Sequence, residues 1–527
     1  MADLINLTID GHEVSVPRGT TILEAAKTIG TEVPHYCYHP GMSSPAMCRL
    51  CLVEVEGAPK PMPGCVTTVA DGQVVHTQSD QALSNRRGVL EFYLVNHPLD
   101  CPICDMSGEC NLQDYVHAEG RDHGRGREPK RVFGRDDFGG DVLFYGDRCV
   151  MCTRCVRFMN EVEQDARLTV VERGNRSVID TFFDEGLEGT HWHGNIVDIC
   201  PVGALVSKEF LHKARAWDLT HTPSVCTSCS QGCNIDLHTR DNLVQRLKPR
   251  ENLDVNGWWM CDYGRHSYEW INQGDRIEAP LVRADESSKA TGWKDALTAL
   301  LAKADGAGSV KAVASPFSSN EDLAALKSVV DAFGGGSITY RSARAADEVP
   351  LKGFPGLVRR KDLTPNATGA ELMGMTRVGA DDATGGLDEV ANHDGIVIVL
   401  GDDLPDHGDG FGAKASLYIY LGQHESAATA AAHFVLPVTT HAEGEGTFTN
   451  HAGRVQRFSP ALQPPGMARP AWLILGALAA ERAGGAVPTT AADAFAASGV
   501  KAFDGISYDD IGSRGAVVNE SVSLTGD

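Results

Sequence analysis

Cysteine is the residue type in this chain best suited to metal and redox chemistry, and its distribution is uneven. All fifteen cysteines lie between residues 37 and 261, and none follows. In a reducing compartment, thiols in tight groups indicate metal binding rather than disulfides. The groups are Cys37, Cys48, Cys51 and Cys65; Cys101, Cys104 and Cys110; Cys149, Cys152, Cys155 and Cys200; and Cys226, Cys229, Cys233 and Cys261.

Three groups supply four thiolates each, but the second supplies only three. His97 precedes Cys101 by four positions and is the predicted fourth ligand, with Asp100 and Asp105 as the alternatives. With His97, sixteen ligands divide into four sets of four, and no cysteine is left over. We call these the first, second, third and fourth sets, in chain order. Closed sets of this kind suit iron–sulfur clusters, and structural zinc is the alternative for each.

The first set follows a predicted hairpin and helix. Strands are expected over residues 4–9 and 12–16 around the turn Asp10-Gly11, and a capping box from Thr21 to Glu24 begins a helix that ends near Gly30. A hairpin followed by a helix resembles the β-grasp ferredoxin fold, so the spacing C-x10-C-x2-C-x13-C predicts a [2Fe–2S] cluster. The histidines that flank Cys37, His35 and His39, are expected to pack beside the site and not to ligate.

The second set begins at the end of a predicted helix over residues 86–97, which Pro98 stops. One neutral imidazole in place of a thiolate makes a cluster less negative. We therefore expect a [4Fe–4S] cluster with a raised reduction potential, as histidine ligation raises that of Rieske centres.

The third and fourth sets each predict one [4Fe–4S] cluster. The third has the run C-x2-C-x2-C with a remote Cys200-Pro201, which is typical of bacterial ferredoxins and implies a ferredoxin-like scaffold. The fourth has C-x2-C-x3-C and a cysteine after a gap of 27 residues. With the segment 258–265 (WWMCDYGR), it resembles the N-terminal module of molybdopterin oxidoreductases.

The cysteine-free part predicts a doubly wound α/β domain. Buried strands are expected over 310–314, 396–400 and 417–421, and a helix over 319–333. Neither of the two glycine-rich nucleotide-binding motifs, G-x-G-x-x-G after a strand or G-x-x-x-x-G-K-[ST], occurs here. The stretch from Phe434 to Gln456 again resembles molybdopterin oxidoreductases, but no residue matches their molybdenum ligand. We expect a degenerate domain without that cofactor.

The bulk composition excludes some classes of function. A formal net charge of −23 argues against a nucleic-acid partner, and the basic segment 121–135 is predicted to be a connecting loop or a protein contact. No apolar run is long enough to cross a bilayer, and residues 1–9 do not resemble a secretory signal. The protein is therefore expected in the cytoplasm.

The serial order of the four sets resembles the large iron–sulfur subunit of respiratory complex I (NADH–quinone oxidoreductase), of the bacterial type with an additional fourth cluster. Supporting stretches are residues 98–105 (PLDCPICD), 108–110 (GEC) and 200–205 (CPVGAL). The resemblance implies a multidomain α+β and α/β chain. Its predicted parts are a β-grasp [2Fe–2S] domain (1–80), a one-His/three-Cys domain (81–140), a ferredoxin-like domain (141–218), a [4Fe–4S] module (219–275) and a degenerate molybdopterin-oxidoreductase-like domain (276–527).

The resemblance also implies a role. Electrons would come from NADH through a flavin on a partner subunit and pass along these clusters towards quinone-site subunits, with a small [2Fe–2S] subunit as a further partner. The fourth cluster would lie off the main path. No molybdopterin, flavin or NAD is expected on this chain, which would sit at the cytoplasmic face of the bacterial plasma membrane as a peripheral subunit.

Three other functions compete with this interpretation. An iron-only hydrogenase would need further cysteines after Cys261 for its active cluster. A catalytic enzyme like formate dehydrogenase would need the molybdenum ligand that we cannot match. A structural scaffold would hold zinc in the four sets.

Overall fold

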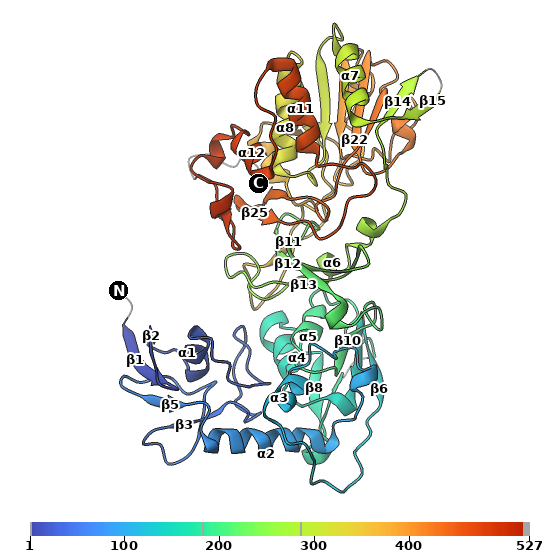
Figure 1. Ribbon diagram of the computed structural model, residues 1–527. Coiled ribbons are helices and arrows are strands. Elements are labelled where there is room, and N and C mark those ends of the chain that lie inside the picture. Colours follow the sequence, from blue (N-terminus) through green and yellow to red (C-terminus); the bar gives the residue numbers. More distant parts are fainter. Residues whose placement is uncertain (1–2, 182–183, 285–286, 520–527) are drawn as a thin grey trace. The chain divides into compact units, whose positions relative to one another are not determined.

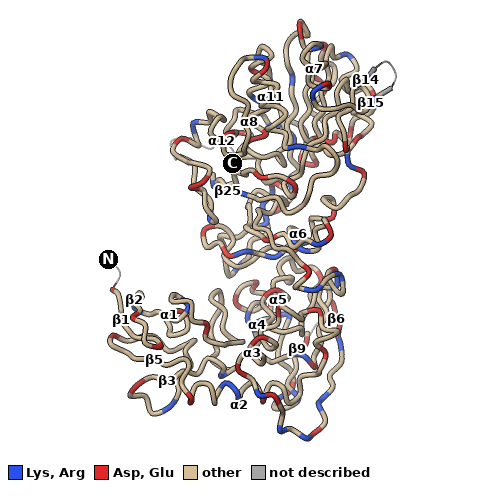
Figure 2. Tube along the Cα trace, in the orientation of Figure 1, with Lys and Arg blue, Asp and Glu red and all other residues tan. Residues whose placement is uncertain are grey.

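The computed structural model describes residues 3–181, 184–284 and 287–519. Residues 1–2, 182–183, 285–286 and 520–527, which the predicted domains include, lie outside that description. The chain forms two compact units, residues 1–219 with 351–354, and residues 220–350 with 355–527 (Figure 1). Acidic and basic residues are scattered over both units (Figure 2). In the described ranges, no helix is both long and apolar enough to cross a bilayer.

The first unit opens with the predicted hairpin. β1 (Leu4–Ile9) and β2 (His12–Pro17) pair antiparallel around Asp10 and Gly11, whose positive φ values of 48° and 84° suit a two-residue turn. With β5 (Val74–His76), β3 (Leu52–Val55) and β4 (Met62–Pro63) they form a five-stranded sheet, in which β1 and β5 are parallel. The apolar face of this sheet packs on α1 (Ile22–Thr28).

Only one half of the predicted capping box is present at α1. The Thr21 hydroxyl accepts a hydrogen bond of 3.3 Å from the backbone N–H of Glu24. The Glu24 carboxylate instead accepts one of 2.6 Å from the hydroxyl of Tyr38, beside the first set. The Glu24 side chain, which was expected to complete the cap, therefore links α1 to the loop that carries Cys37.

The helix before the second set is longer than predicted. α2 (Asp80–Asn96) begins after Ser79, whose hydroxyl accepts from the N–H of Ala82, and it ends at His97, before Pro98. α3 (Asn111–Glu119) packs against it through an ion pair of 2.7 Å between the buried Arg86 and Glu119. Residues 120–134 contain no helix or strand, as expected for a connecting loop.

The third set lies in a small α/β scaffold. β6 (Arg135–Gly139), β7 (Val142–Tyr145) and β10 (Leu205–Ser207) form one antiparallel sheet, and β8 (Leu168–Val171) pairs with β9 (Val178–Thr181). α4 (Arg154–Arg157) and α5 (Gly194–Asp198) accompany these strands. The two helices precede or contain ligands of the third set.

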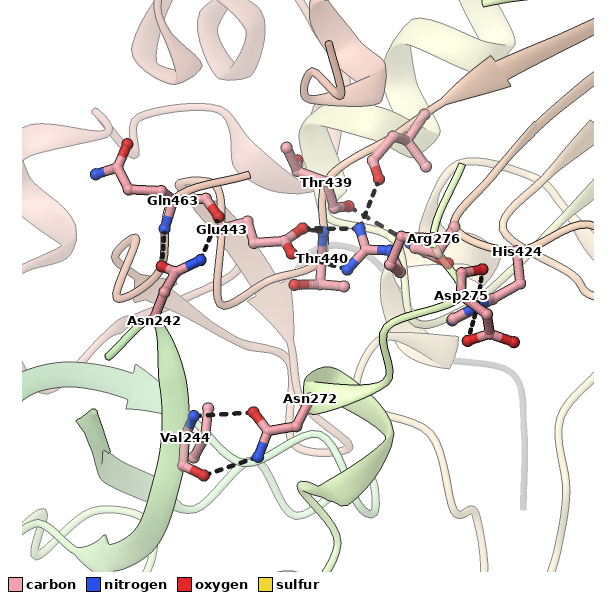
Figure 3. Close-up of polar contacts among 12 residues, drawn as sticks. Asn242, Val244, Asn272, Asp275, Arg276, His424, Thr439, Thr440, Glu443 and Gln463 are labelled. Carbon is pink, nitrogen blue, oxygen red and sulfur yellow. Dashed lines mark hydrogen bonds and ion pairs between the residues drawn. The ribbon is translucent and has the colours of Figure 1, made fainter. Parts of the chain in front are cut away.

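The second unit starts with an antiparallel sheet of β11 (Thr220–Val225), β12 (Asn234–Arg240) and β13 (Leu243–Pro249). Figure 3 shows how the segment that follows is fixed within this unit. The Asn272 amide bonds both backbone groups of Val244, at 2.8 and 2.9 Å. Arg276 forms a buried two-bond ion pair with Glu443, at 2.8 and 2.9 Å.

An eight-stranded sheet forms the centre of the second unit. Its order is β15-β14-β23-β22-β21-β16-β17-β20, and the strands from β23 to β20 are parallel. Chain order reverses between β16 and β21, as in doubly wound folds. The strands are β14 (Leu281–Ala284), β15 (Ser287–Ala290), β16 (Val310–Ala314), β17 (Gly336–Tyr340), β20 (Thr376–Arg377), β21 (Ile396–Leu400), β22 (Leu417–Gly422) and β23 (Phe434–Pro437). The three predicted strands are confirmed.

Hydrophobic cores cover both faces of this sheet. α7 (Trp293–Ala304), α8 (Asn320–Ala332) and α11 (Ala471–Ala483) share one core with alternate strand residues such as Ala312 and Ile398. The intervening residues, such as Val399 and Tyr418, pack in a second core with α10 (Asp388–Ala391). The predicted α/β layering is therefore present, because these strands are apolar on both faces.

Candidate metal centres

The four thiols of the first set converge in the interior of the first unit. All are at most 3 % exposed. Cys37 is hydrogen-bonded to the thiols of Cys48 and Cys65, and Cys65 also to that of Cys51. The hydrogen bond with Cys37, together with burial, raises the pKa of Cys48. Four neighbouring thiols in a dry site fit a cation that would replace their protons.

The two histidines beside this set are engaged by the backbone. Nδ1 of His35 lies 2.8 Å from the Val33 carbonyl, and Nδ1 of His39 accepts from the N–H of Gly41 at 3.1 Å. Burial, aided by Arg154, lowers the pKa of both imidazoles, that of His39 to about 3. These contacts support the expectation that they pack beside the site.

The second set is the most open of the four. Cys101 is exposed at the start of a short 3-10 turn (Cys101–Ile103), whereas Cys104 and Cys110 are buried and Cys110 immediately precedes α3. Burial raises the pKa of Cys110 to about 11, and the Cys104 thiol adds to that rise. The three cysteines therefore lie close enough to interact, with one of them at the surface.

Both alternatives to His97 as the fourth ligand have other hydrogen-bond partners in the fold. Asp100 accepts two hydrogen bonds from the Arg148 guanidinium, at 3.0 and 3.2 Å. Asp105 is buried and accepts from the backbone N–H of His212 at 2.9 Å. Burial, aided by the charge of Arg148, lowers the pKa of His97 to about 4. The imidazole is therefore neutral at physiological pH, which is the form that binds metal.

The thiols of the third set line one small cavity beside Val202 and Leu205. Met151 and Thr153 adopt left-handed φ values of 50° and 57°, which turn successive cysteines towards one another. The N–H of Met151 donates to the sulfur of Cys149 at 3.3 Å. Burial raises the pKa of all four thiols, that of Cys152 to about 12.

The fourth set joins the β11–β12 turn to a later loop of the second unit. Its four thiols are each about 5 % exposed. Cys261 precedes α6 (Asp262–Arg265), and its sulfur accepts from the N–H of Gly264 at 3.3 Å. A Cβ on Gly264 would lie 3.0 Å from the sulfur of Cys226 and 3.5 Å from that of Cys261. The glycine therefore leaves room where two ligands of this set meet.

Apart from the exposed Cys101, the cysteines of the four sets lie in largely dry surroundings, where thiolates are unfavourable without a cation. The residues fit iron–sulfur clusters, which would supply one-electron transfer, and no set offers a proton donor aimed at a substrate. The cysteine motifs did not indicate the arginines that lie beside these sets, which are Arg148, Arg154 and Arg157. The available signal was the pair of arginines on either side of Cys155.

Five family models match successive parts of the chain. Residues 2–80 match a 2Fe-2S iron-sulfur cluster binding domain. Residues 86–125 match the NADH-ubiquinone oxidoreductase-G iron-sulfur binding region, and 139–206 the ferredoxin-like domain of NADH-quinone oxidoreductase subunit 3. Residues 219–273 match the molybdopterin oxidoreductase Fe4S4 domain, and 352–481 molybdopterin oxidoreductase. The chain thus contains 2Fe-2S, 4Fe-4S and molybdopterin-oxidoreductase-type domains.

A solved structure of NAD+-reducing [NiFe]-hydrogenase in the H2-reduced state is 30 % identical and covers 40 % of this chain and 90 % of its own. Its TM-score of 0.36 is too low to establish a common arrangement.

Curated relatives carry complex I names. One of them, a NADH-quinone oxidoreductase subunit from Rickettsia bellii, is 40 % identical over 301 residues, which are 57 % of this chain and 44 % of the relative. The chain thus spans about half the length of the bacterial relatives it matches first. The 78 kDa subunit of mitochondrial NADH-ubiquinone oxidoreductase from Candida albicans is 30 % identical over 90 % of this chain and 82 % of its own. The chain therefore belongs to the family of the large iron–sulfur subunit of NADH–quinone oxidoreductase, which confirms the resemblance drawn from its cysteine motifs.

Proposed function

We propose that this chain is the iron–sulfur electron-transfer subunit of a proton-pumping NADH:quinone oxidoreductase, complex I. It receives electrons from a flavin- and NADH-binding subunit and passes them towards quinone. The observation that carries the proposal is the placement of the cysteines: the thiols of the third set line one cavity, and those of the first and fourth sets are buried. A set with four protein ligands keeps no open position for a substrate, which suits a carrier better than a reaction centre.

The proposed ligands are those of the sequence analysis. The first set holds a [2Fe–2S] cluster, and the second, with His97, holds a [4Fe–4S] cluster. The third and fourth sets each hold one [4Fe–4S] cluster, and the fourth lies off the main path. The five predicted domains, with boundaries after residues 80, 140, 218 and 275, are part of the same proposal.

The proposed partners are other subunits of the peripheral arm: the flavin subunit, a small [2Fe–2S] subunit and the quinone-site subunits. The names of the relatives support membership of such a complex. The chain would reach the cytoplasmic face of the bacterial plasma membrane through these partners.

The last domain is proposed to work without a pterin cofactor. A cavity of about 300 Å³ lies where β16, β21 and β22 end, beside Ser315, Gly401 and Gln423. Its described lining includes Asp322, Asp403 and Glu445 but no lysine or arginine. Phosphate groups on a pterin cofactor would need cationic partners there. These residues do not fit that group.

The test is metal analysis and spectroscopy on anaerobically purified protein. One [2Fe–2S] and three [4Fe–4S] clusters bring about fourteen irons per chain, with matching acid-labile sulfide. Graded reduction followed by low-temperature EPR should resolve the clusters one after another. Zinc without iron and sulfide would end the electron-transfer proposal. Bound molybdenum or tungsten with a pterin would restore the catalytic alternative.

A further inference from the structure

Two arginines of α4 reach from the third set to the first. Arg157 donates to the carbonyl oxygen of Cys37 in the first set, and at 3.4 Å to that of Cys152 in the third. Arg154 donates to the carbonyl of Tyr38, next to Cys37, and at 3.0 Å to that of Ile199, next to Cys200. Both arginines are less than 10 % exposed. Each guanidinium therefore lies in the interior, with contacts to segments of both sets.

Other buried arginines of the first unit have a carboxylate partner. Arg86 pairs with Glu119 at 2.7 Å, and Arg148 with Asp100 at 3.0 Å. Within the described residues, no carboxylate oxygen pairs with Arg154 or Arg157, and Nε of Arg154 has no hydrogen-bond partner at all. Isolated buried charges are strongly unfavourable, so proteins bury them with a counter-charge.

The titratable groups near the pair do not supply that counter-charge directly. Glu161 acts on Arg157 through space, but its oxygens accept from the N–H of Ser43, at 2.8 Å, and from the Ser43 hydroxyl. His35 and His39 act on Arg154 through space, but an imidazole supplies no negative charge. The ligand thiols of the two sets also act on the pair, since Cys152 and Cys37 both lie close enough to influence Arg157.

The carbonyls to which the two arginines donate belong to ligands or to their chain neighbours. Arg157 donates to the carbonyls of Cys37 and Cys152, and Arg154 to those of Tyr38 and Ile199. The net charge of an iron–sulfur cluster and the hydrogen bonds around it set its reduction potential.

We propose that Arg154 and Arg157 are shared counter-ions of the first and third clusters and that they raise the reduction potentials of both. The inference rests on the proposed function, because it requires the clusters. Each reduction adds one electron to a cluster, and a fixed positive charge beside it stabilises the reduced form. One buried pair of cations therefore acts on two neighbouring carriers at once.

The experiment compares R157Q and R154Q with wild-type protein by EPR-monitored redox titration. The third-set signal is assigned by its loss in C155S. In R157Q, reduction of both the first and the third cluster should become about tenfold less favourable, which is about 59 mV for one electron. The second and fourth clusters should keep their potentials. R157K and R154K retain the charge and should titrate close to wild type.

R167Q is the matched control, because Arg167 lies in the same unit but pairs with Asp165 at 2.9 Å. The proposal is overturned if both Gln variants titrate like R167Q, or if the Lys variants shift as far as the Gln variants do. If R157Q does not retain its clusters, R157K decides. If R157K keeps its clusters at wild-type potentials, the positive charge at residue 157 is what the clusters need. If R157K also loses them, Arg157 has a purely structural role and the proposal is overturned. Wild-type protein without iron would refute the proposed function, which is a different outcome.

Discussion

Replacing Gly203 with alanine should remove the second cluster, although Gly203 lies in the loop of the third set. A Cβ at this position would lie 2.2 Å from the sulfur of Cys104 and 3.1 Å from Cβ of Met106. Non-bonded heavy atoms of this kind need about 3.5 Å, so the Cys104 sulfur would have to move by roughly 1.3 Å. Metal ligands tolerate displacements of only about 0.2 Å. Cys104 could then no longer ligate, and G203A should lose about four irons per chain.

The assay is the iron and sulfide content of G203A, together with the EPR signal that is absent from C110S protein. The control is G88A. Gly88 lies inside α2, and a Cβ there would meet no heavy atom within 4 Å, so this variant should keep every cluster. G88A should also be more stable by about 0.5–1 kcal/mol, because alanine favours helix interiors. If G203A keeps all its iron and an unchanged second signal, the packing of Gly203 on Cys104 is not as described.

Three further predictions concern single residues. H97C should keep a [4Fe–4S] cluster, but the reduction potential of that cluster should fall by a shift on the order of 100 mV, since a thiolate adds negative charge. If the midpoint potential measured by EPR is unchanged, His97 is not a ligand of the second set. E443Q leaves Arg276 buried without its counter-charge, so the free energy of unfolding of the second unit in urea should fall by about 3 kcal/mol. A fall below about 1 kcal/mol would contradict the ion pair. Burial raises the pKa of Glu321 from 4.5 to about 7. The folded state then holds a proton that the unfolded state has lost, so wild-type stability should fall between pH 4.5 and 7, by up to about 3 kcal/mol, and E321Q should lack this fall in pH-dependent unfolding.

Helices and strands that are marked by short sequence patterns, such as turns, caps and apolar runs, could be predicted. The Asp10-Gly11 turn fixes its hairpin, and apolar runs mark the strands now seen as Val310–Ala314, Ile396–Leu400 and Leu417–Gly422. The predicted helix over 319–333 is Asn320–Ala332, begun by the Ser319 capping box. The helix before the second set was predicted to begin six residues too late, at residue 86 instead of Asp80. Its first turns are polar, and only the Ser79 cap reveals where they begin.

Candidate ligand sets could be predicted because the thiol spacing is visible in the sequence, whereas the charged residues around them could not. No sequence pattern around Asp100 indicates that its carboxylate will accept hydrogen bonds from the Arg148 guanidinium. In the sequence, Arg154 and Arg157 resemble surface residues of a short helix, but they are buried, and Arg157 donates to the carbonyl of Ser43 in the loop of the first set. Such contacts join residues more than a hundred positions apart, so no local pattern carries them.

The second and third sets are separate in sequence but not in the folded chain. The N–H of Asn111, next to Cys110, donates at 3.0 Å to the carbonyl of Pro201, next to Cys200. Arg148 donates to Asp100 beside the second set and, at 3.5 Å, to the carbonyl of Gly203. Because these bonds anchor both ligand loops to one another, the geometry of each set depends on the fold of the other. The two loops are therefore coupled: a side chain added at Gly203, in the loop of the third set, reaches a ligand of the second set, whereas the fourth set, in the second unit, should keep its cluster in such a variant.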